Sequence, residues 1–249
     1  MPANSLVVYD GPSKIDGRRI IVILSGLAES SDNAKTGAMV QSWILCAAAD
    51  PIGASRMGFD YSICGDCPMR GAARPEALQG VAAGRGCYVN LLHGPQSIYN
   101  AWARGNVAQA TPKDAARMLA GRMLRLGSYG DPAAVPAAVW RPLIAAAKGW
   151  TGYTHARGRL ARFDWLMASC ETKAQAEALR SKGARTFRVV SDVADVDRAA
   201  EVLCPASAES GRKATCETCG LCAGTAKGAK SVAIVAHGTG RAHALRVIQ

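Results

Sequence analysis

The sequence lacks any apolar run long enough to cross a bilayer. The longest candidates, 20–27 and 40–49, have the length of a strand or are interrupted by polar residues. The amino terminus also lacks a basic segment followed by a long apolar core, so we expect no export signal. These absences favour a cytoplasmic protein without a membrane partner. Thiols stay reduced in that compartment, so the nine cysteines are not expected to form a disulfide framework.

Several motifs of enzymes are also missing. There is no phosphate-binding P-loop, no nucleophile elbow and no Ser/His/Asp order, and no repeat or low-complexity tract interrupts the chain. Acidic residues are few, with 19 Asp and Glu against 30 Lys and Arg, which gives a net charge of +11. This surplus favours an anionic partner such as nucleic acid or a nucleotide. A solvated surface rich in arginine explains the charge equally well.

The fold class follows from the alternation of strand and helix patterns. A chain of 249 residues with 49% hydrophobic content suits one large α/β domain. Strands separated by helices predict parallel βαβ units, and together a partial (β/α) barrel of about six parallel strands. The expected strands are 38–46, 124–129, 150–154, 164–168, 184–190 and 231–236, and the expected helices are 95–105, 111–123, 136–148, 172–183 and 195–203.

We expect a single domain, 1–249, with four parts. Residues 1–37 form N-terminal edge strands, and 38–203 form the barrel core with a cysteine loop at 47–90. Residues 204–224 are a cysteine-rich segment, and 225–249 hold the last strand and a tail. The stretch 47–86 has no helical period, and a loop of that length is expected to wrap a site or a metal.

Seven of the nine cysteines fall into two sets. The first cysteine group is Cys64-x-x-Cys67 with Cys87, and the second cysteine group is Cys204, Cys216, Cys219 and Cys222. A C-x-x-C step lets two thiolates reach one inorganic centre from a tight turn, while further ligands come from distant loops. Metal or iron–sulfur ligation is therefore predicted at both groups.

The two groups differ in their number of thiols. Four thiolates in the second cysteine group can close a zinc site or hold a four-iron cluster. The three thiolates of the first cysteine group would leave one iron open to substrate or cofactor, and alternatively His93 or Asp66 completes a zinc site. Cys46 and Cys170 are expected to be buried thiols, although Cys170 could face the site.

Two further side chains are expected at the carboxyl edge of the sheet. The strand over 124–129 ends in Gly130-Asp131-Pro132, and ligands bind at that edge in α/β proteins. The alternative is that this segment only turns the chain. His155 closes the next strand and would point into the same mouth, unless a backbone group satisfies its ring. His237, at the end of the last strand, is comparable.

In this order the elements resemble the radical S-adenosylmethionine superfamily. In that family, a loop after the first barrel strand binds a four-iron cluster through three thiolates, and the second strand ends in a Gly-Gly-Glu-Pro-like turn that holds the amino group of the cofactor. Here the loop carries the first cysteine group, and the next strand ends in Tyr129-Gly130-Asp131-Pro132. Met167-Ala168-Ser169 resembles the family's fourth strand end, and the second cysteine group an auxiliary cluster segment. The family's C-x-x-x-C-x-x-C spacing is absent, and Asp131 replaces Glu.

This resemblance implies a set of roles. The cofactors would be one or two [4Fe-4S] clusters and S-adenosylmethionine, with an external electron donor as partner. Asp131 would bind the cofactor's ammonium beside Tyr129 and Gly130, and Ser169 and Arg188 would contact its ribose or carboxylate. His155 and Tyr153 would contact the substrate, so that Asp131, His155 and Tyr153 form the expected catalytic set.

The chain also resembles a set of phage proteins that share Asn-Ala-Lys-Thr-Gly (33–37), a Cys-Pro loop, Cys-Tyr and Gly-Asp. Because phage genomes of this kind often encode enzymes that hypermodify DNA bases, this resemblance implies a base or nucleotide substrate and an isomerisation or other rearrangement. One alternative is a zinc-containing, base-exchanging DNA transglycosylase on a barrel, with Asp131 as nucleophile. Another is a zinc-stapled nucleic-acid-binding protein without catalysis.

Overall fold

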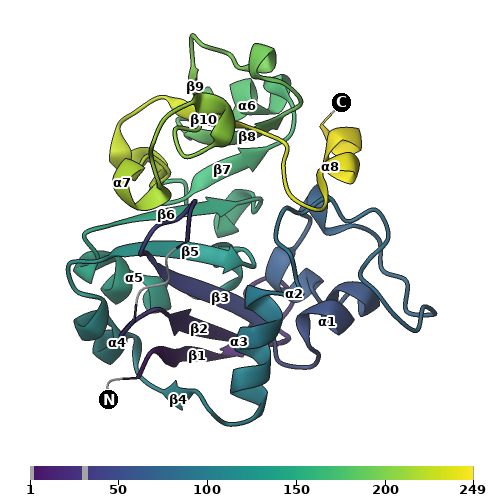
Figure 1. Cartoon of the computed structure of the whole chain (residues 1–249), viewed down its shortest axis with the longest axis vertical. Helices are drawn as coiled ribbons and strands as arrows, with labels where there is room; N and C mark the ends of the chain where they lie inside the picture. The colour runs from purple at the N-terminus through teal and green to yellow at the C-terminus, as the bar shows by residue number, and fades with distance from the viewer. Residues whose placement is uncertain (1–2, 30–32, 249) are drawn as a thin grey trace.

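The computed structural model describes residues 3–29 and 33–248, and its strands form one sheet (Figure 1). The sheet has 10 strands in the order β4-β1-β2-β3-β5-β6-β7-β8-β10-β9. The strands are β1 (Ser5–Pro12), β2 (Arg19–Ser25), β3 (Val40–Cys46), β4 (Ala108–Gln109), β5 (Met123–Tyr129), β6 (Gly149–Thr154), β7 (Met167–Cys170), β8 (Thr186–Val190), β9 (Glu201–Leu203) and β10 (Ser231–Val235).

Eight α-helices and six 3-10 turns connect the described strands. The α-helices are α1 (Pro51–Met57), α2 (Tyr61–Cys64), α3 (Gly94–Ala103), α4 (Pro112–Leu119), α5 (Ala137–Ala146), α6 (Lys173–Arg180), α7 (Cys216–Cys219) and α8 (Arg241–Val247). The 3-10 turns are η1 (Pro68–Arg70), η2 (Pro132–Ala134), η3 (Gly158–Leu160), η4 (Val193–Asp195), η5 (Ala208–Ser210) and η6 (Gly224–Lys227).

The predicted α/β class with a mostly parallel sheet is confirmed. From β3 to β9 every neighbouring pair of strands is parallel, whereas β1, β2 and β3 pair antiparallel. All the expected core strands exist, as β3, β5, β6, β7, β8 and β10, and they are neighbours in chain order. The expected number of about six strands is nevertheless too low, and the strand order does not confirm the barrel. Within the described residues, the outermost strands β4 and β9 do not pair with each other.

Capping side chains fix where several helices begin. The hydroxyl of Thr111 accepts a hydrogen bond from the N–H of Asp114 at the start of α4. Thr172 and Gln175 form a reciprocal capping box at the start of α6, in which each side chain accepts from the other residue's N–H. Such caps satisfy main-chain donors that the first helical turn leaves free, and they fix where each helix begins.

Two expectations about local structure are wrong. The helix expected over 195–203 is instead η4 followed by the strand β9, because Glu201 enters the sheet edge and pairs with a buried arginine of β8. The stretch 47–86 is not free of helix, since it contains α1, α2 and η1. Asp50 caps α1 by accepting from the N–H groups of Ile52 and Gly53. Both α-helices are too short to show an apolar period.

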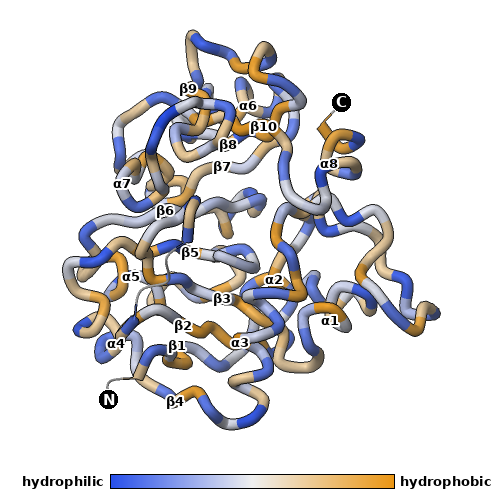
Figure 2. The backbone as a smooth tube through the Cα atoms, in the orientation of Figure 1, coloured by the Kyte–Doolittle hydropathy of each residue, from blue (hydrophilic) through white to orange (hydrophobic). Residues whose placement is uncertain are grey.

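The main hydrophobic core lies in the N-terminal half of the sheet. Residues 20–24 of β2 are fully buried because strands flank β2 on both sides and helices cover the sheet. Figure 2 shows apolar, orange stretches in β2 and β10, whereas the loops mix blue, white and orange. The strands β7 to β10 are held by smaller, separate apolar clusters. No helix within the described ranges is both long and apolar enough to span a membrane.

Candidate functional site

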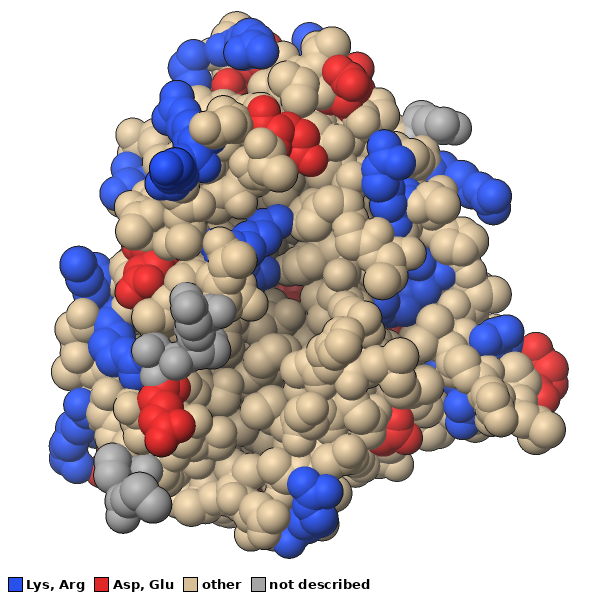
Figure 3. Space-filling model, viewed as in Figure 1, with Lys and Arg blue, Asp and Glu red and all other residues tan. Residues whose placement is uncertain are grey.

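One cavity lies along the carboxyl ends of the parallel strands. Its volume is about 180 Å³, and it is lined by residues of β5, β6, β7, β8 and β10 and of the loop after β3. The space-filling view is hollowed near its centre, with Lys and Arg side chains around the hollow (Figure 3). The cavity therefore occupies the edge where α/β proteins bind ligands.

The first cysteine group forms one wall of this cavity. All three thiols line it, although Cys87 lies 20 residues after Cys67 in the chain. The N–H groups of Gly86 and Cys87 both donate to the carbonyl of Met69, each at 3.0 Å, which holds the distant cysteine against η1. Burial raises the pKa of the Cys64 thiol, and the neighbouring Asp60 and the other two thiols raise it further.

A glycine turn brings Cys64 and Cys67 close together. Gly65 has φ 54° and ψ −137°, a conformation that residues with a Cβ rarely adopt. The chain therefore reverses directly after α2, and the N–H of Cys67 donates to the carbonyl of Cys64 at 3.2 Å. The C-x-x-C segment thus presents both thiols to the same cavity.

Asp131 also lines the cavity, and hydrogen bonds from the chain occupy its carboxylate. Oδ1 accepts from the N–H of Ala133 at 2.9 Å. Oδ2 accepts from the Thr154 hydroxyl at 3.0 Å and from the N–H of His155 at 2.8 Å. Burial raises the pKa of Asp131, and these hydrogen bonds oppose that shift. The carboxylate therefore ties the end of β5 to the end of β6.

His155 lies between the first cysteine group and an acidic residue. Its Nε2 lies 2.7 Å from Oε1 of Glu171, which follows β7. Burial lowers the pKa of His155, but the neighbouring Cys67 and Glu171 outweigh it and bring the pKa to about 10. Glu171 was not predicted from the sequence, because only the fold brings it next to the histidine.

The second cysteine group surrounds a separate, small cavity of about 10 Å³. Cys204 and Cys216 line both this cavity and the large one, so the two sites adjoin. The N–H of Cys216 donates to the carbonyl of Lys35 at 2.9 Å, which attaches the 33–37 turn to α7. The second cysteine group is therefore a neighbour of the large cavity, on a different wall from the first.

Basic and aromatic side chains lie between the two groups. Arg125 of β5 is 6% exposed, and its Nη2 donates to the Tyr88 hydroxyl at 2.7 Å. Lys35 Nζ lies 2.7 Å from Nε2 of His237. Sequence reasoning missed Arg125, although a charge between Leu124 and Leu126 in an apolar strand is a signal that could have identified it.

The remaining expected cofactor contacts are placed unequally. Tyr129, Gly130 and Ser169 all line the cavity. The Tyr129 hydroxyl is buried and has no hydrogen-bond partner among the described residues. A Cβ on Gly130 would lie 2.7 Å from Cβ of Ile44, so glycine is required for this close approach. Tyr153 lines the cavity too, but its side chain also reaches Cys222 and packs on Phe187.

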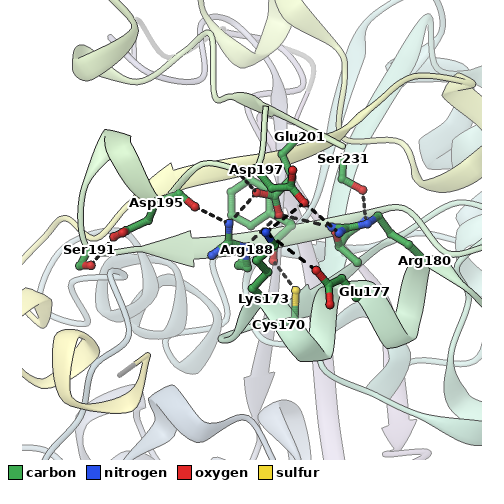
Figure 4. Close-up of polar contacts among 12 residues, drawn as sticks. Cys170, Lys173, Glu177, Arg180, Arg188, Ser191, Asp195, Asp197, Glu201 and Ser231 are labelled. Carbon is green, nitrogen blue, oxygen red and sulfur yellow. Dashed lines mark hydrogen bonds and ion pairs between the residues drawn. The ribbon is translucent and has the colours of Figure 1, made fainter. Parts of the chain in front are cut away.

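Arg188 does not line the cavity, and the expectation that it contacts a cofactor needs correction. Side chains of a strand alternate between the two faces, and its neighbours Phe187 and Val189 point to the cavity. Arg188 donates from Nε and Nη2 to the carboxylate of Glu201 at 2.9 and 2.6 Å (Figure 4). Its role in the structure is to fix β9 against β8.

Neither alternative fourth ligand of the first cysteine group lines the cavity. His93 precedes α3 and Asp66 is exposed, and both are absent from the cavity wall. Cys46 is buried elsewhere, where its thiol donates to the carbonyl of Phe59. Cys170 does face the cavity.

The spacing of the donors bears on the kind of centre they could hold. Within residues 3–29 and 33–248, no three Cys, His, Asp or Glu side chains surround a single point closely enough to bind one ion. A zinc ion requires thiolates at about 2.3 Å. A four-iron cluster takes each thiolate on a different iron, so its ligands stand further apart.

Comparisons with protein-family models, with curated proteins and with solved structures give no match. The cavity and the residues that line it are therefore the basis for assigning a function.

Proposed function

We propose that the protein is an iron–sulfur enzyme of the radical S-adenosylmethionine type that acts on a nucleic-acid base or nucleotide. The observation that carries the proposal is the common cavity of the first cysteine group and the Tyr129–Asp131 strand end. Tyr129 lies 42 positions after Cys87 in the chain. Their meeting at one sheet edge was expected from the family resemblance.

The donor set of the first cysteine group fits a cluster with one open iron. It offers three thiols, and neither His93 nor Asp66 reaches the cavity to supply a fourth protein ligand. The thiolates of Cys64, Cys67 and Cys87 would hold such a cluster, which, with an external electron donor, would supply the reducing electron for cleavage of S-adenosylmethionine and so for hydrogen abstraction from the substrate.

The residues of the chain would bind and orient the reactants. Tyr129 and Ser169 both line the cavity and would contact the cofactor. Asp131 contributes negative charge near a cofactor ammonium, but its three hydrogen bonds make it foremost a positioning residue for His155. His155 and Tyr153 would contact the substrate.

The shape of the sheet supports a partial barrel around this cavity. Five neighbouring strands in a flat sheet span about 19 Å. The ends of β5, β6, β7, β8 and β10 nevertheless border one cavity of about 180 Å³. We propose on this ground, the common cavity of five strand ends, that the sheet curls as in a partial (β/α) barrel.

The second cysteine group is proposed as an auxiliary centre. Four thiols around a small cavity suit a second four-iron cluster or a structural zinc. Because Cys204 and Cys216 also border the large cavity, an iron–sulfur centre there would lie next to the substrate.

The rival transglycosylase is less well supported. It needs Asp131 as a free nucleophile, and the carboxylate oxygens of Asp131 already accept three hydrogen bonds from the chain. A non-catalytic zinc-stapled protein accounts for the net charge of +11 but not for the cavity lined by buried titratable groups.

The test is metal and sulfide analysis of protein purified without oxygen. We expect brown protein that dithionite bleaches, and loss of about one four-iron cluster in a Cys64→Ala/Cys67→Ala/Cys87→Ala variant. Cys46→Ala is the matched control, because Cys46 does not line the cavity and its thiol donates to the carbonyl of Phe59. The reduced wild type should convert S-adenosylmethionine to 5′-deoxyadenosine. Colourless protein with stoichiometric zinc, or a triple variant that keeps all its iron, would contradict the proposal.

A further inference from the structure

An arginine that pairs with no carboxylate of the described residues lies deep in the cavity. Arg125 is 6% exposed, and among the described residues its guanidinium makes a single hydrogen bond, to the Tyr88 hydroxyl. A guanidinium carries five N–H donors. Its other nitrogens are not fully enclosed by protein atoms. They therefore border the open space of the cavity.

Every acidic side chain that lines the cavity is already engaged. Asp60 pairs with Arg70 at 2.7 Å, and Glu171 pairs with His155 at 2.7 Å. The carboxylate of Asp131 accepts three hydrogen bonds from the chain. Within the described part of the chain, Arg125 therefore has no ion-pair partner.

A second cation extends the same wall. The ammonium of Lys35 donates to Nε2 of His237 at 2.7 Å, while Nδ1 of that ring lies 3.0 Å from the carbonyl of Val235. This arrangement fits a neutral histidine that donates through Nδ1 and accepts through Nε2. The centroids of the Tyr88 and His237 rings lie 5.6 Å apart. Tyr88 therefore lies between the Lys35–His237 pair and Arg125, which donates to its hydroxyl. Two further ammonium donors remain beside the cavity.

A buried cation is costly unless opposite charge compensates it. The groups beside Arg125 that can oppose its charge are the weakly acidic Tyr88, Tyr153 and Cys216, none of them a carboxylate. We propose that Arg125, with Lys35 and Tyr88, forms an oxyanion site between the two cysteine groups, and that it binds the carboxylate or phosphate of a small-molecule substrate. The planar guanidinium matches either group through two parallel hydrogen bonds. The inference names the substrate class of the proposed function, and for the reaction it rests on that function.

The site would orient the substrate. The first cysteine group and the Tyr129–Asp131 strand end lie on one wall, and Arg125 lies toward Cys216 of the second cysteine group. An anionic tail fixed on Arg125 would leave the other end of the substrate near His155 and the cofactor. Such anchoring keeps a reacting carbon in place during hydrogen abstraction.

The test is isothermal titration of the full-length protein with inorganic phosphate and, separately, with acetate in an oxyanion-free buffer. We expect one site, and the ion that binds more tightly identifies the substrate group as phosphate or carboxylate. Arg125→Gln should weaken binding about tenfold or more, the loss expected for a charged hydrogen-bond partner. Lys35→Met should weaken it severalfold, and Arg141→Gln, at an exposed position of α5, should leave it unchanged.

Further variants and measurements keep the result decisive. If Arg125→Gln does not fold, Arg125→Lys and Tyr88→Phe decide, since each should give an intermediate loss of affinity. Unchanged affinity in these variants, or no binding of either ion to wild type, would overturn the oxyanion site. Loss of metal with unchanged ion affinity would also overturn it, because Arg125 would then serve the second cysteine group.

The failure of this site and the failure of the proposed function are distinguishable. Iron content and 5′-deoxyadenosine formation are measured on the same preparations. Ion binding without iron would retain the oxyanion site and reject the radical chemistry. Iron and cofactor cleavage without ion binding would do the reverse.

Discussion

The main-chain N–H of Asp131 donates to the carbonyl of Ile63 at 2.6 Å. This bond joins the end of β5 to the helical turn that carries Cys64. The Asp131 carboxylate accepts two further hydrogen bonds, which join the end of β5 to the end of β6. One residue thus connects the first cysteine group with His155, so disturbance at Asp131 should be felt on both sides of the cavity.

Asp131→Asn tests this connection. An asparagine keeps one oxygen acceptor but presents an amide NH₂ where the carboxylate had its second oxygen. Either the N–H of Ala133 loses its acceptor, or the Thr154 hydroxyl and the His155 N–H, which share Oδ2, both lose theirs. We expect the free energy of unfolding to fall by about 1–3 kcal/mol. Urea denaturation measures the change, with the exposed Asp66→Asn as control. Equal midpoints for the two variants would show that the connection contributes nothing.

Glu201→Gln tests the structural role of Arg188. Removal of one charge from a buried ion pair leaves the other uncompensated, which costs about 3–5 kcal/mol. The pair is buried, with 5% exposure for Arg188 and 2% for Glu201. We expect strong destabilisation in urea but an unchanged dissociation constant for S-adenosylmethionine at a temperature where the variant is folded.

A double variant, Arg188→Met/Glu201→Leu, is the matched control for that pair. Replacement of both charges by apolar groups is often close to neutral for stability. It should therefore recover most of the stability lost in Glu201→Gln. Weaker binding of S-adenosylmethionine to the well-folded double variant would instead show that Arg188 contributes to cofactor binding.

Arg185→Leu tests how the second cysteine group is held in place. The Arg185 guanidinium donates to the carbonyls of Leu221, Gly224 and Lys230 at 2.8, 2.7 and 2.6 Å. Its loss leaves these carbonyls without their donor, and we expect about 2–3 kcal/mol of destabilisation in urea. The metal content of the second cysteine group should fall as well. Arg141→Leu on the exposed side of α5 should change neither quantity.

The core of the fold was predictable from the sequence because its strands and helices carry strong local signals. The β-branched run of β2 and the capping residues Thr111 and Thr172 each act within one element. The edge strand β9 was not predicted, because a strand of three residues shows no alternation of apolar and polar side chains. The pairing of Glu201 with Arg188 also becomes visible only in the fold. The sequence analysis also missed α1, although Asp50 before it, Pro51 at its first position and Gly58 after it are helix-end signals.

The site was predictable only in part, for a related reason. Cysteine spacing and strand ends identify the first cysteine group, Asp131 and His155, since those signals are written along the chain. Arg125, Lys35 and Glu171 reach the same cavity from three separate segments. Their convergence depends on strand order and on which face each side chain takes, and sequence spacing alone specifies neither.

The two cysteine groups should bind their metals independently of each other. They lie on different walls of the cavity, and only Cys204 and Cys216 of the second group border it. Cys219→Ser/Cys222→Ser should therefore remove the metal of the second group and leave that of the first. A preparation with two four-iron clusters should lose about half its iron and sulfide. One with a cluster and a zinc should lose only zinc.

The activity of the same variant completes this prediction. Because the first cysteine group keeps its cluster, reduced protein should still form 5′-deoxyadenosine from S-adenosylmethionine. The midpoint of urea unfolding should fall, since Cys222 is buried and its carbonyl accepts from the N–H of Gly152 at 2.9 Å in a segment that the metal would hold together. Loss of all metal and of 5′-deoxyadenosine together would instead mean that the two groups load as one unit.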